Sequence, residues 1–353
     1  MIIAAAAILF FVTTAFIMVK LFYDKKFPRF DKPEFCFDLK FTEVKGVSRT
    51  PIQFRSGKNT LRGHLYGADN HKGIVVIAHG LKSGSEEYLA ETLYFVRRGW
   101  RVFTYDCTGS HESEGKGTKG LSQSLLDLHA ALSYIEENKY LNILPIMLYG
   151  HSWGGYAAAA VLNYKHDIAA SVSLAGYNSP IEMFTEHIKD MIPGFFAFLL
   201  YPFGWLYQVL LFGKAGAMTA VSGINCSGAG VMIIHGTGDN VIKYGGASII
   251  AHKAQITNPK TFYMTCSDEH RNGHSDLHMT AEANLYRKEK DGEFRALSER
   301  FGGRVPREAI IKFYEGVDKA KANELDMKFM GAINAFFEGA NLRKNTGTDI
   351  KSL

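Results

Sequence analysis

One serine stands in a pattern typical of a catalytic nucleophile. Ser152 lies in Gly150-His-Ser-Trp-Gly154, a G-x-S-x-G sequence between an expected buried strand and an Ala-rich segment expected to be helical. A sharp strand-to-helix turn projects the hydroxyl into solvent, and the flanking glycines allow the backbone to crowd there. An ordinary Gly-rich turn is the alternative. The pattern predicts a serine hydrolase with Ser152 as its nucleophile.

A serine hydroxyl needs a base that removes its proton and a carboxylate that orients the base. Asp239 closes the loop Gly236-Thr-Gly-Asp239 after an expected strand, where ligand sites of open α/β sheets collect. It is the predicted acid, and a solvated turn residue is its alternative.

Three histidines follow the next expected strand. We choose His274 as the base, because Gly273 gives it a flexible loop approach and an apolar run and helix begin just after it. His270 and His278 are expected to be surface or supporting residues, and each stays an alternative base. The spacing of four would align the three histidines as zinc ligands on a helix, but Asn272-Gly273 disfavours a helix there. No second ligand cluster is evident, so we expect no metal and no cofactor.

Attack on a carbonyl generates an oxyanion, and one preorganised donor is worth about 10²- to 10³-fold in rate. His79-Gly80-Leu81 ends an expected strand, so the backbone N–H of Leu81 can face that of Trp153, the residue after the nucleophile. These two groups are the predicted oxyanion hole, and a simple strand-ending turn is the alternative for His79-Gly80.

The elements that must position these residues alternate between strand and helix, which predicts an α/β fold with a mostly parallel sheet and helices on both faces. An antiparallel hairpin is expected first, over 51–55 and 60–66. Further strands are expected over 73–78, 100–105, 144–149, 169–175, 231–235 and 261–265, and helices over 86–98, 122–137, 155–164, 246–255 and 324–338. The predicted domain plan is an anchor over 1–23, a linker over 24–49, a core over 50–176 and 229–343, a lid over 177–228 and a flexible tail over 344–353.

The lid segment carries the highest aromatic density of the chain. Pro193, Pro202 and several glycines are expected to cut it into pieces too short to cross a membrane. A wall of Phe, Leu, Tyr and Trp favours a substrate with an apolar acyl or aryl group. Packing against the core, or contact with a bilayer surface, is an equal alternative.

In these residues and motifs, the chain resembles the α/β-hydrolases, particularly the serine aminopeptidase-like and monoacylglycerol lipase-like branch. The resemblance covers about residues 50–176 and 229–340 and includes the loop Asp106-Cys-Thr-Gly-Ser-His-Glu-Ser-Glu-Gly115. Thr108 stands where the family often has arginine, and Ser110-His111 replaces its usual His-Gly. The resemblance implies an α/β-hydrolase fold with a lid between the nucleophile and acid segments, and it does not transfer a substrate.

The first nineteen residues carry no charged side chain, and a helix of that length spans roughly 30 Å, the thickness of bilayer hydrocarbon. A cleaved signal peptide is the alternative, although no basic residue precedes the apolar run. Basic residues follow the run, namely Lys20, Lys25, Lys26, Arg29 and Lys32. We therefore expect a single-pass anchor in the cell membrane with the hydrolase domain on the cytoplasmic side.

Charge and cysteine content indicate which classes of binding partner are unfavourable for this chain. The net charge of +5 is spread along the chain without a Lys/Arg block, which disfavours nucleic acid as a partner. Cys36, Cys107, Cys226 and Cys266 lie far apart without metal-binding spacing, so we expect free thiols. No obligate protein partner is evident.

These features favour hydrolysis of a carboxylic ester or lipid-like small molecule through an acyl-enzyme. An amidase or aminopeptidase, an acyltransferase with the same triad, and a noncatalytic binding protein on a hydrolase scaffold are the alternatives.

Overall fold

A computed structural model of the chain describes residues 2–346, with side chains through residue 342, and is built on one eight-stranded sheet. The strand order is β1-β2-β4-β3-β5-β6-β7-β8. The strands are β1 (Arg49–Ser56), β2 (Asn59–Tyr66), β3 (Ile74–Ala78), β4 (Arg101–Tyr105), β5 (Ile146–His151), β6 (Ile168–Leu174), β7 (Gly230–Gly236) and β8 (Thr261–Cys266). The pairs β1–β2 and β2–β4 are antiparallel and all later pairs are parallel, which confirms the predicted hairpin and fold class.

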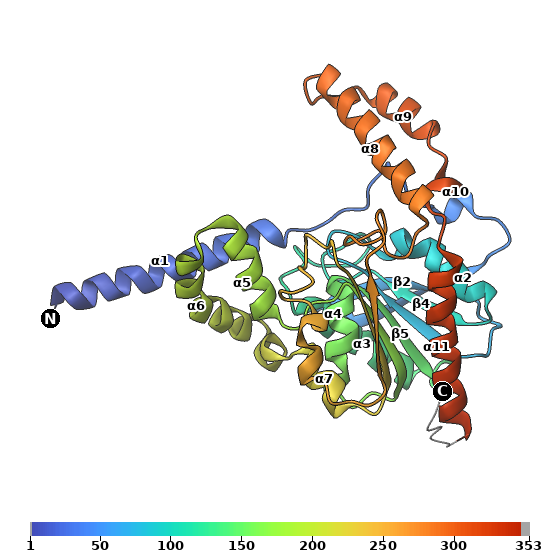
Figure 1. The fold of residues 1–353 in the computed structure, drawn as a ribbon, viewed down its shortest axis with the longest axis horizontal. Helices are drawn as coiled ribbons and strands as arrows, with labels where there is room; N and C mark the ends of the chain where they lie inside the picture. The colour runs from blue at the N-terminus through green and yellow to red at the C-terminus, as the bar shows by residue number, and fades with distance from the viewer. Residues whose placement is uncertain (1, 347–353) are drawn as a thin grey trace.

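Helices cover both faces of the sheet (Figure 1). α3 (Gln123–Glu137), α4 (Trp153–Ala160) and α7 (Ala220–Cys226) bury apolar side chains in the core on one face. α2 (Leu89–Arg97) and α11 (Met327–Thr346) do so on the other. Because both faces are covered, all five residues of β3 are buried, as its unbroken β-branched run predicts.

Several short elements complete the body as 3₁₀ helices. They are η1 (Phe41–Glu43), η2 (Ser85–Tyr88), η3 (Val161–Asn163), η4 (Gly213–Ala217) and η5 (Ile249–Gln255). The last replaces the helix expected over 246–255 and has a kink at His252, where the backbone is not helical. The closing helix α11 begins at Met327 and reaches Thr346, so only residues 347–353 of the expected tail lie outside the described part.

The lid segment contains α5 (Pro180–Met191) and α6 (Gly194–Phe212). The expectation of short pieces was wrong, because α6 runs continuously through Pro202 for 19 residues. Proline removes one hydrogen bond from a helix interior, but tertiary packing stabilises α6 despite Pro202. The Phe184 ring of α5 lies against Gly204, where an added Cβ would be 2.3 Å from the ring.

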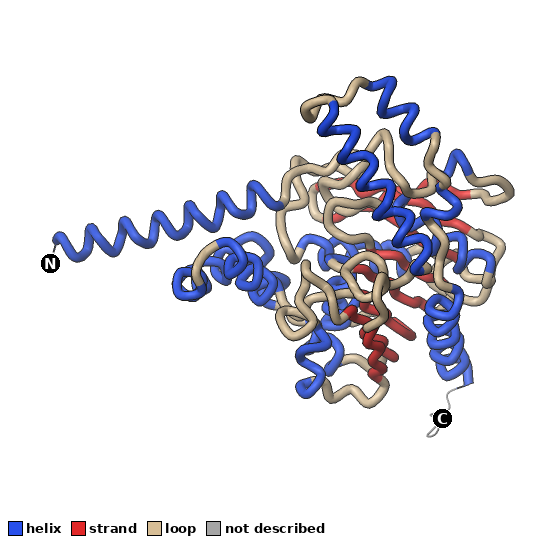
Figure 2. The backbone as a smooth tube through the Cα atoms, turned by 45° about the horizontal axis from the view of Figure 1, so that its top comes forward, coloured by secondary structure: helices blue, strands red, loops and turns tan. Residues whose placement is uncertain are grey.

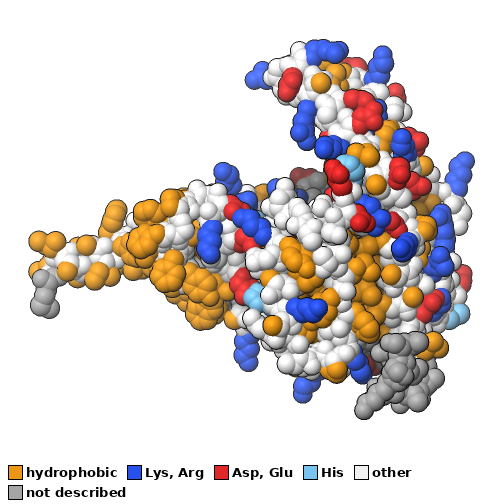
Figure 3. All heavy atoms as spheres, viewed as in Figure 1, with side chains coloured by type: hydrophobic (Ala, Val, Ile, Leu, Met, Phe, Trp, Pro, Cys, Tyr) orange, Lys and Arg blue, Asp and Glu red, His pale blue; other side chains and the backbone are white. Residues whose placement is uncertain are grey.

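α1 (Ile2–Lys26) projects from the body and lies along the lid (Figure 1). The rings of Phe11 and Phe16 meet Phe203 of α6 edge-to-face at 5.8 and 5.4 Å between centroids. Closer to the body, Tyr23 packs against Tyr207 at 4.9 Å and is itself buried. The outer part of α1 is apolar and exposed, so hydrophobic side chains gather over α1 and the neighbouring lid (Figure 3).

A second projection rises at the top of the body, away from the free end of α1 (Figure 2). It consists of α8 (Ala281–Arg300) and α9 (Arg307–Glu315), which the short α10 (Lys319–Ala322) links to the closing helix. The residues of this projection are rich in charged side chains. Its base holds the segment after α1, since Arg287 donates a hydrogen bond of 2.8 Å to Asp38.

Replacing Tyr23 tests whether α1 is an integral part of the fold. Tyr23→Ala should lower the free energy of unfolding by about 3 to 5 kcal/mol, because it empties a buried aromatic site. Tyr23→Phe is the matched control and should cost less than about 1 kcal/mol, because the Tyr23 hydroxyl has no hydrogen-bond partner among the described residues. The measurement is chemical denaturation of the detergent-solubilised protein. Equal stability of the two variants would contradict the packing of α1.

Candidate active site

Ser152 lies at a strained turn between β5 and α4. Its backbone has φ of 56° and ψ of −114°, values rarely adopted by a residue other than glycine. Its N–H donates to the Leu174 carbonyl at 2.8 Å, which ties the turn to β6. An added Cβ at Gly150 would lie 2.1 Å from the Gly154 carbonyl oxygen, and one at Gly154 would lie 1.9 Å from that of Ala78. Both flanking glycines are therefore required by close backbone contacts.

The structure brings the three predicted triad residues together. His274 Nε2 lies 2.8 Å from Ser152 Oγ, and His274 Nδ1 lies 2.7 Å from Asp239 Oδ2. Each residue follows the carboxyl end of a different strand, which is where ligand sites of open α/β sheets form. The alternative bases lie outside this arrangement. His270 is half-exposed, and His278 is buried with its Nε2 3.2 Å from Glu91.

The carboxylate of Asp239 has four partners. Its Oδ1 accepts the N–H groups of Val241 and Ile242 at 2.8 and 2.9 Å, and its Oδ2 faces His274 and, at 3.1 Å, His235. Burial alone would raise the pKa of Asp239, but the hydrogen bonds from His235 and His274 and the Ile242 N–H hold it well below its usual range. The group is thus an anion at neutral pH.

A second network joins three loops around Ser152. His151 Nε2 lies 2.9 Å from the His274 carbonyl, which only accepts, so this nitrogen carries the proton. His151 Nδ1 is then the acceptor of the Tyr88 hydroxyl at 2.7 Å, and the Tyr88 oxygen accepts the Gly80 N–H at 2.9 Å. Burial, then the nearby His274, lowers the pKa of His151 to about 4, so the ring is neutral at pH 7.

The predicted oxyanion donors flank the serine. Gly80 packs beside Ser152, since an added Cβ there would lie 3.6 Å from Ser152 Cβ. Trp153 is the first residue of α4, where an N–H has no partner within the helix. Among the described residues, no acceptor engages the N–H of Leu81 either. The strand end at His79-Gly80 is fixed because His79 Nδ1 donates to the Gly80 carbonyl at 2.7 Å and Nε2 accepts the Cys107 N–H at 2.8 Å.

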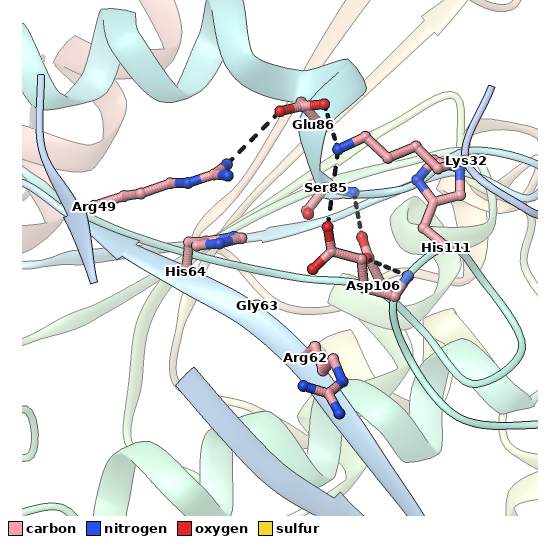
Figure 4. Close-up of a pocket in the computed structure, with 10 residues that line it drawn as sticks. Lys32, Arg49, Arg62, Gly63, His64, Ser85, Glu86, Asp106 and His111 are labelled. Atoms are coloured by element: carbon pink, nitrogen blue, oxygen red, sulfur yellow. Dashed lines mark hydrogen bonds and ion pairs between the residues drawn. The ribbon is translucent and has the colours of Figure 1, made fainter. Parts of the chain in front are cut away.

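The loop from Asp106 to Gly115 holds a small polar pocket away from Ser152 (Figure 4). Asp106 accepts the N–H groups of Ser85 and Glu112 at 2.7 and 3.1 Å. Lys32 pairs with Glu86 at 2.6 Å, so the segment after α1 is fastened here. The Lys32 and Glu86 charges therefore compensate one another, and the pocket holds the segment after α1 against η2 and the 106–115 loop.

Another cavity, of about 250 Å³, opens directly beside the serine. Its lining joins the nucleophile turn to the start of α2, the His274 loop and the base of α8, and includes Gly80, Leu81, Tyr88, Glu91, His151, Ser152, His274, His278 and Arg287. Within residues 2–346, no group of three or more His, Cys, Asp or Glu side chains has an arrangement that could hold a metal ion. The expected lack of a cofactor stays a prediction.

Reasoning from the sequence missed the supporting residues His235, His151 and Tyr88. For two of them, a nearby sequence pattern could have indicated the role. His151 lies inside the serine pattern, and His235 ends the strand before the acid loop. Tyr88 had none, because its partners come from other loops.

Comparison with known proteins agrees with this architecture. Residues 69–200 match the family model described as serine aminopeptidase, S33. Polyketide transferase grgF of Penicillium sp is 25% identical over 141 residues, which cover 39% of this chain and 44% of that protein. The bifunctional esterase/perhydrolase DCH of Acinetobacter calcoaceticus is 28% identical over 121 residues, 34% of this chain and 42% of that protein. The matches thus span less than half the length of these two relatives.

Among solved structures, the Pyrococcus furiosus esterase Pf2001 superposes with a TM-score of 0.53 at 15% identity, covering 77% of this chain and 98% of that one. Acetyl xylan esterase 1 from Thermoanaerobacterium gives 0.51 at 15% identity, covering 74% and 88%. At this identity the likeness concerns the fold alone. The mostly parallel sheet and the serine turn between β5 and α4 form an α/β-hydrolase fold, and residues 69–200 within it resemble the serine aminopeptidase family.

Proposed function

We propose that this chain is a serine hydrolase that cleaves a carboxylic ester through an acyl-enzyme on Ser152. The observation that carries the proposal is the continuous hydrogen-bond path from Ser152 through His274 to Asp239, with steps of 2.8 and 2.7 Å. Such a path is what a weak hydroxyl nucleophile needs for activation.

In the proposed cycle, His274 Nε2 accepts the Ser152 proton as Oγ attacks the ester carbonyl. The N–H groups of Leu81 and Trp153 stabilise the negative oxygen that forms. The protonated His274 then gives its proton to the leaving alcohol. In the second half, His274 accepts a proton from water as the water attacks the acyl-enzyme, and then returns that proton to Ser152 Oγ as the acid is released. Asp239 stabilises the charged imidazole throughout, which its lowered pKa supports.

We further propose that α1 tethers the enzyme to the cell membrane, with the body on the cytoplasmic side. By length and composition, α1 and the segment Gly194–Cys226 are the candidate spans among the described residues. Phe22 and Tyr23 are buried against the lid, so removal of α1 would expose apolar surface. This packing supports an anchor that is retained over a signal peptide that is cleaved.

For the substrate we propose an apolar acyl or aryl group beneath the lid, residues 177–228. The outward side of α6 is rich in exposed Phe, Trp and Leu side chains, and Phe184 of α5 is buried in the core. We also propose the two-part core, 50–176 with 229–343, as the functional domain.

Ser152→Ala should reduce hydrolysis of p-nitrophenyl acetate by at least about a thousandfold, because no other group supplies the acyl acceptor. It should also abolish labelling by a fluorophosphonate probe. His270→Asn is the matched control, since His270 lies outside the hydrogen-bond path and asparagine tolerates its φ of 68°. Full turnover by Ser152→Ala would contradict the assignment, and an unlabelled wild type would favour a noncatalytic binding protein.

The acyl preference is measurable with p-nitrophenyl esters from acetate to octanoate. Each methylene buried beneath the lid should raise kcat/KM by about fourfold until the site is full. Rates are corrected for spontaneous hydrolysis of each ester. A flat profile beyond acetate would count against an acyl-binding lid.

The tether is testable by an alkaline carbonate wash of isolated membranes. The wild type should stay in the pellet with residues 1–23 intact by mass. Phe10→Lys should release it or impair its insertion, because a charge near the centre of a span costs about 2.5 to 3.5 kcal/mol. Tyr140→Lys, at an exposed position on the body, is the control. A mature chain that lacks residues 1–23 would show a cleaved signal peptide.

A further inference from the structure

The cavity beside Ser152 is lined by more carboxylates than its cations balance. Asp38, Glu87 and Glu91 reach it, together with Arg287. Arg287 is already engaged, since it donates to Asp38 at 2.8 Å and to Asn323 at 2.6 Å. The Asp38 charge is thereby compensated, and no lysine or arginine of the described chain pairs with Glu87 or Glu91 in this cavity.

Glu91 is a buried carboxylate with unused hydrogen-bonding capacity. The residue is 2% exposed, and within the described chain its Oε1 has no hydrogen-bond partner of acceptable geometry. His278 Nε2 lies 3.2 Å from this oxygen. Burial, followed by the effect of His151 and Arg287, lowers the pKa of His278 to about 3, so this ring is neutral and adds no charge. A buried carboxylate without a partner is costly unless a ligand satisfies it.

Glu87 lies one helical turn before Glu91 and faces the same cavity. Its Oε2 accepts the Gly84 N–H at 2.9 Å, and its Oε1 lies 3.5 Å from His111 Nε2. Burial first lowers the pKa of His111, so this imidazole is a weak counterion. The two glutamates therefore form an acidic patch, defined as Glu87 and Glu91, and among the described residues neither forms an ion pair with a lysine or an arginine.

The patch lies on the side of Ser152 where a leaving group must sit. In the proposed reaction, His274 delivers its proton to the leaving oxygen, so the alcohol part must lie next to His274. The cavity is bounded there by His274, Ser275 and His278. The aromatic lid contributes no residue to this cavity lining, which leaves the acyl part to another side.

We propose that Glu87 and Glu91 form a subsite for a leaving group that carries a positive charge, such as a quaternary or primary ammonium alcohol. The inference rests on the proposed ester hydrolysis and adds a chemical class to one half of the substrate. An ammonium group supplies the charge that the cavity lacks, in a desolvated place where an ion pair is stronger than in water.

The ionisation of the patch supports this assignment. Burial raises the pKa of Glu87 and of Glu91 to about 7 each, with Asp38 adding to both. Asp106 acts in the same direction on Glu87, and Arg287 acts against the rise at Glu91. Among the other titratable groups that line the cavity or lie beside the patch, His111, His151, His278, Tyr88 and Tyr149 are neutral at pH 7. A bound cation favours the ionised carboxylates, so cation binding strengthens as pH rises through about 7.

The test compares acetylcholine with 3,3-dimethylbutyl acetate, two esters of nearly the same shape that differ in the charge of the leaving alcohol. The wild type should favour the cationic ester by about tenfold in kcat/KM at neutral pH. That ratio should rise between about pH 6 and about pH 8, as the glutamates ionise. Because the triad acts on both esters, its own pH dependence cancels in the ratio.

Two substitutions test whether the preference for the cationic ester comes from Glu91. Glu91→Gln should bring the ratio towards one, and Glu293→Gln, the same chemical change on the exposed face of α8, should leave it unaltered. If Glu91→Gln does not fold, the wild type still decides the question. Choline should then inhibit p-nitrophenyl acetate hydrolysis at about tenfold lower concentration than 3,3-dimethylbutan-1-ol.

The possible failures are distinct. A wild type that hydrolyses p-nitrophenyl acetate but shows a ratio of one or less, or equal inhibition by the two alcohols, overturns the cationic subsite and leaves ester hydrolysis intact. An unchanged preference in folded Glu91→Gln removes Glu91 from the site. A wild type with no esterase activity on any of these substrates overturns the proposed function itself, and the subsite with it.

Discussion

The close contact between the nucleophile turn and the end of β3 is the constraint on which the site depends. An added Cβ at Gly154 would lie 1.9 Å from the Ala78 carbonyl oxygen, so the start of α4 touches the backbone of the neighbouring strand. This contact brings Gly80 and Leu81 to Ser152, because they directly follow β3. It also fixes the turn at its strained φ of 56°, since the surrounding strands leave no room for relaxation.

Around that contact, buried polar groups determine one another's roles. The His274 carbonyl can only accept, so His151 Nε2 carries the proton and the Tyr88 hydroxyl donates to His151 Nδ1. The Tyr88 oxygen is then free to accept the Gly80 N–H. The same chain of bonds ties the loop of His274 to the loop that precedes Leu81. A displaced His274 loop would therefore disturb the oxyanion side as well. In a buried network of this kind, each unsatisfied member costs about 1 to 3 kcal/mol, which favours a single arrangement.

Local patterns predicted the fold, and they selected Ser152, Asp239 and His274, which the structure brings together. The β-branched run of β3 and the serine pattern before α4 each follow from short-range preferences. Features set by distant contacts escaped prediction. Pro202 predicted an interrupted helix, because proline lacks a backbone N–H, yet the packing of Phe184 on Gly204 stabilises a continuous α6. His235 reaches Asp239 only through the folded loop, and Glu91 meets His278 across 187 residues of sequence, which no local pattern records.

The molecule has two chemically different regions. α1 and α6 offer exposed apolar side chains without a charged residue over Gly194–Phe212, whereas Glu87 and Glu91 line the cavity beside Ser152 and His274. In the proposed reaction the substrate is handled in two parts, because the acyl group stays on the enzyme while the alcohol departs. An apolar side and an acidic side suit an amphiphilic ester, in which the end that remains and the end that leaves differ in charge.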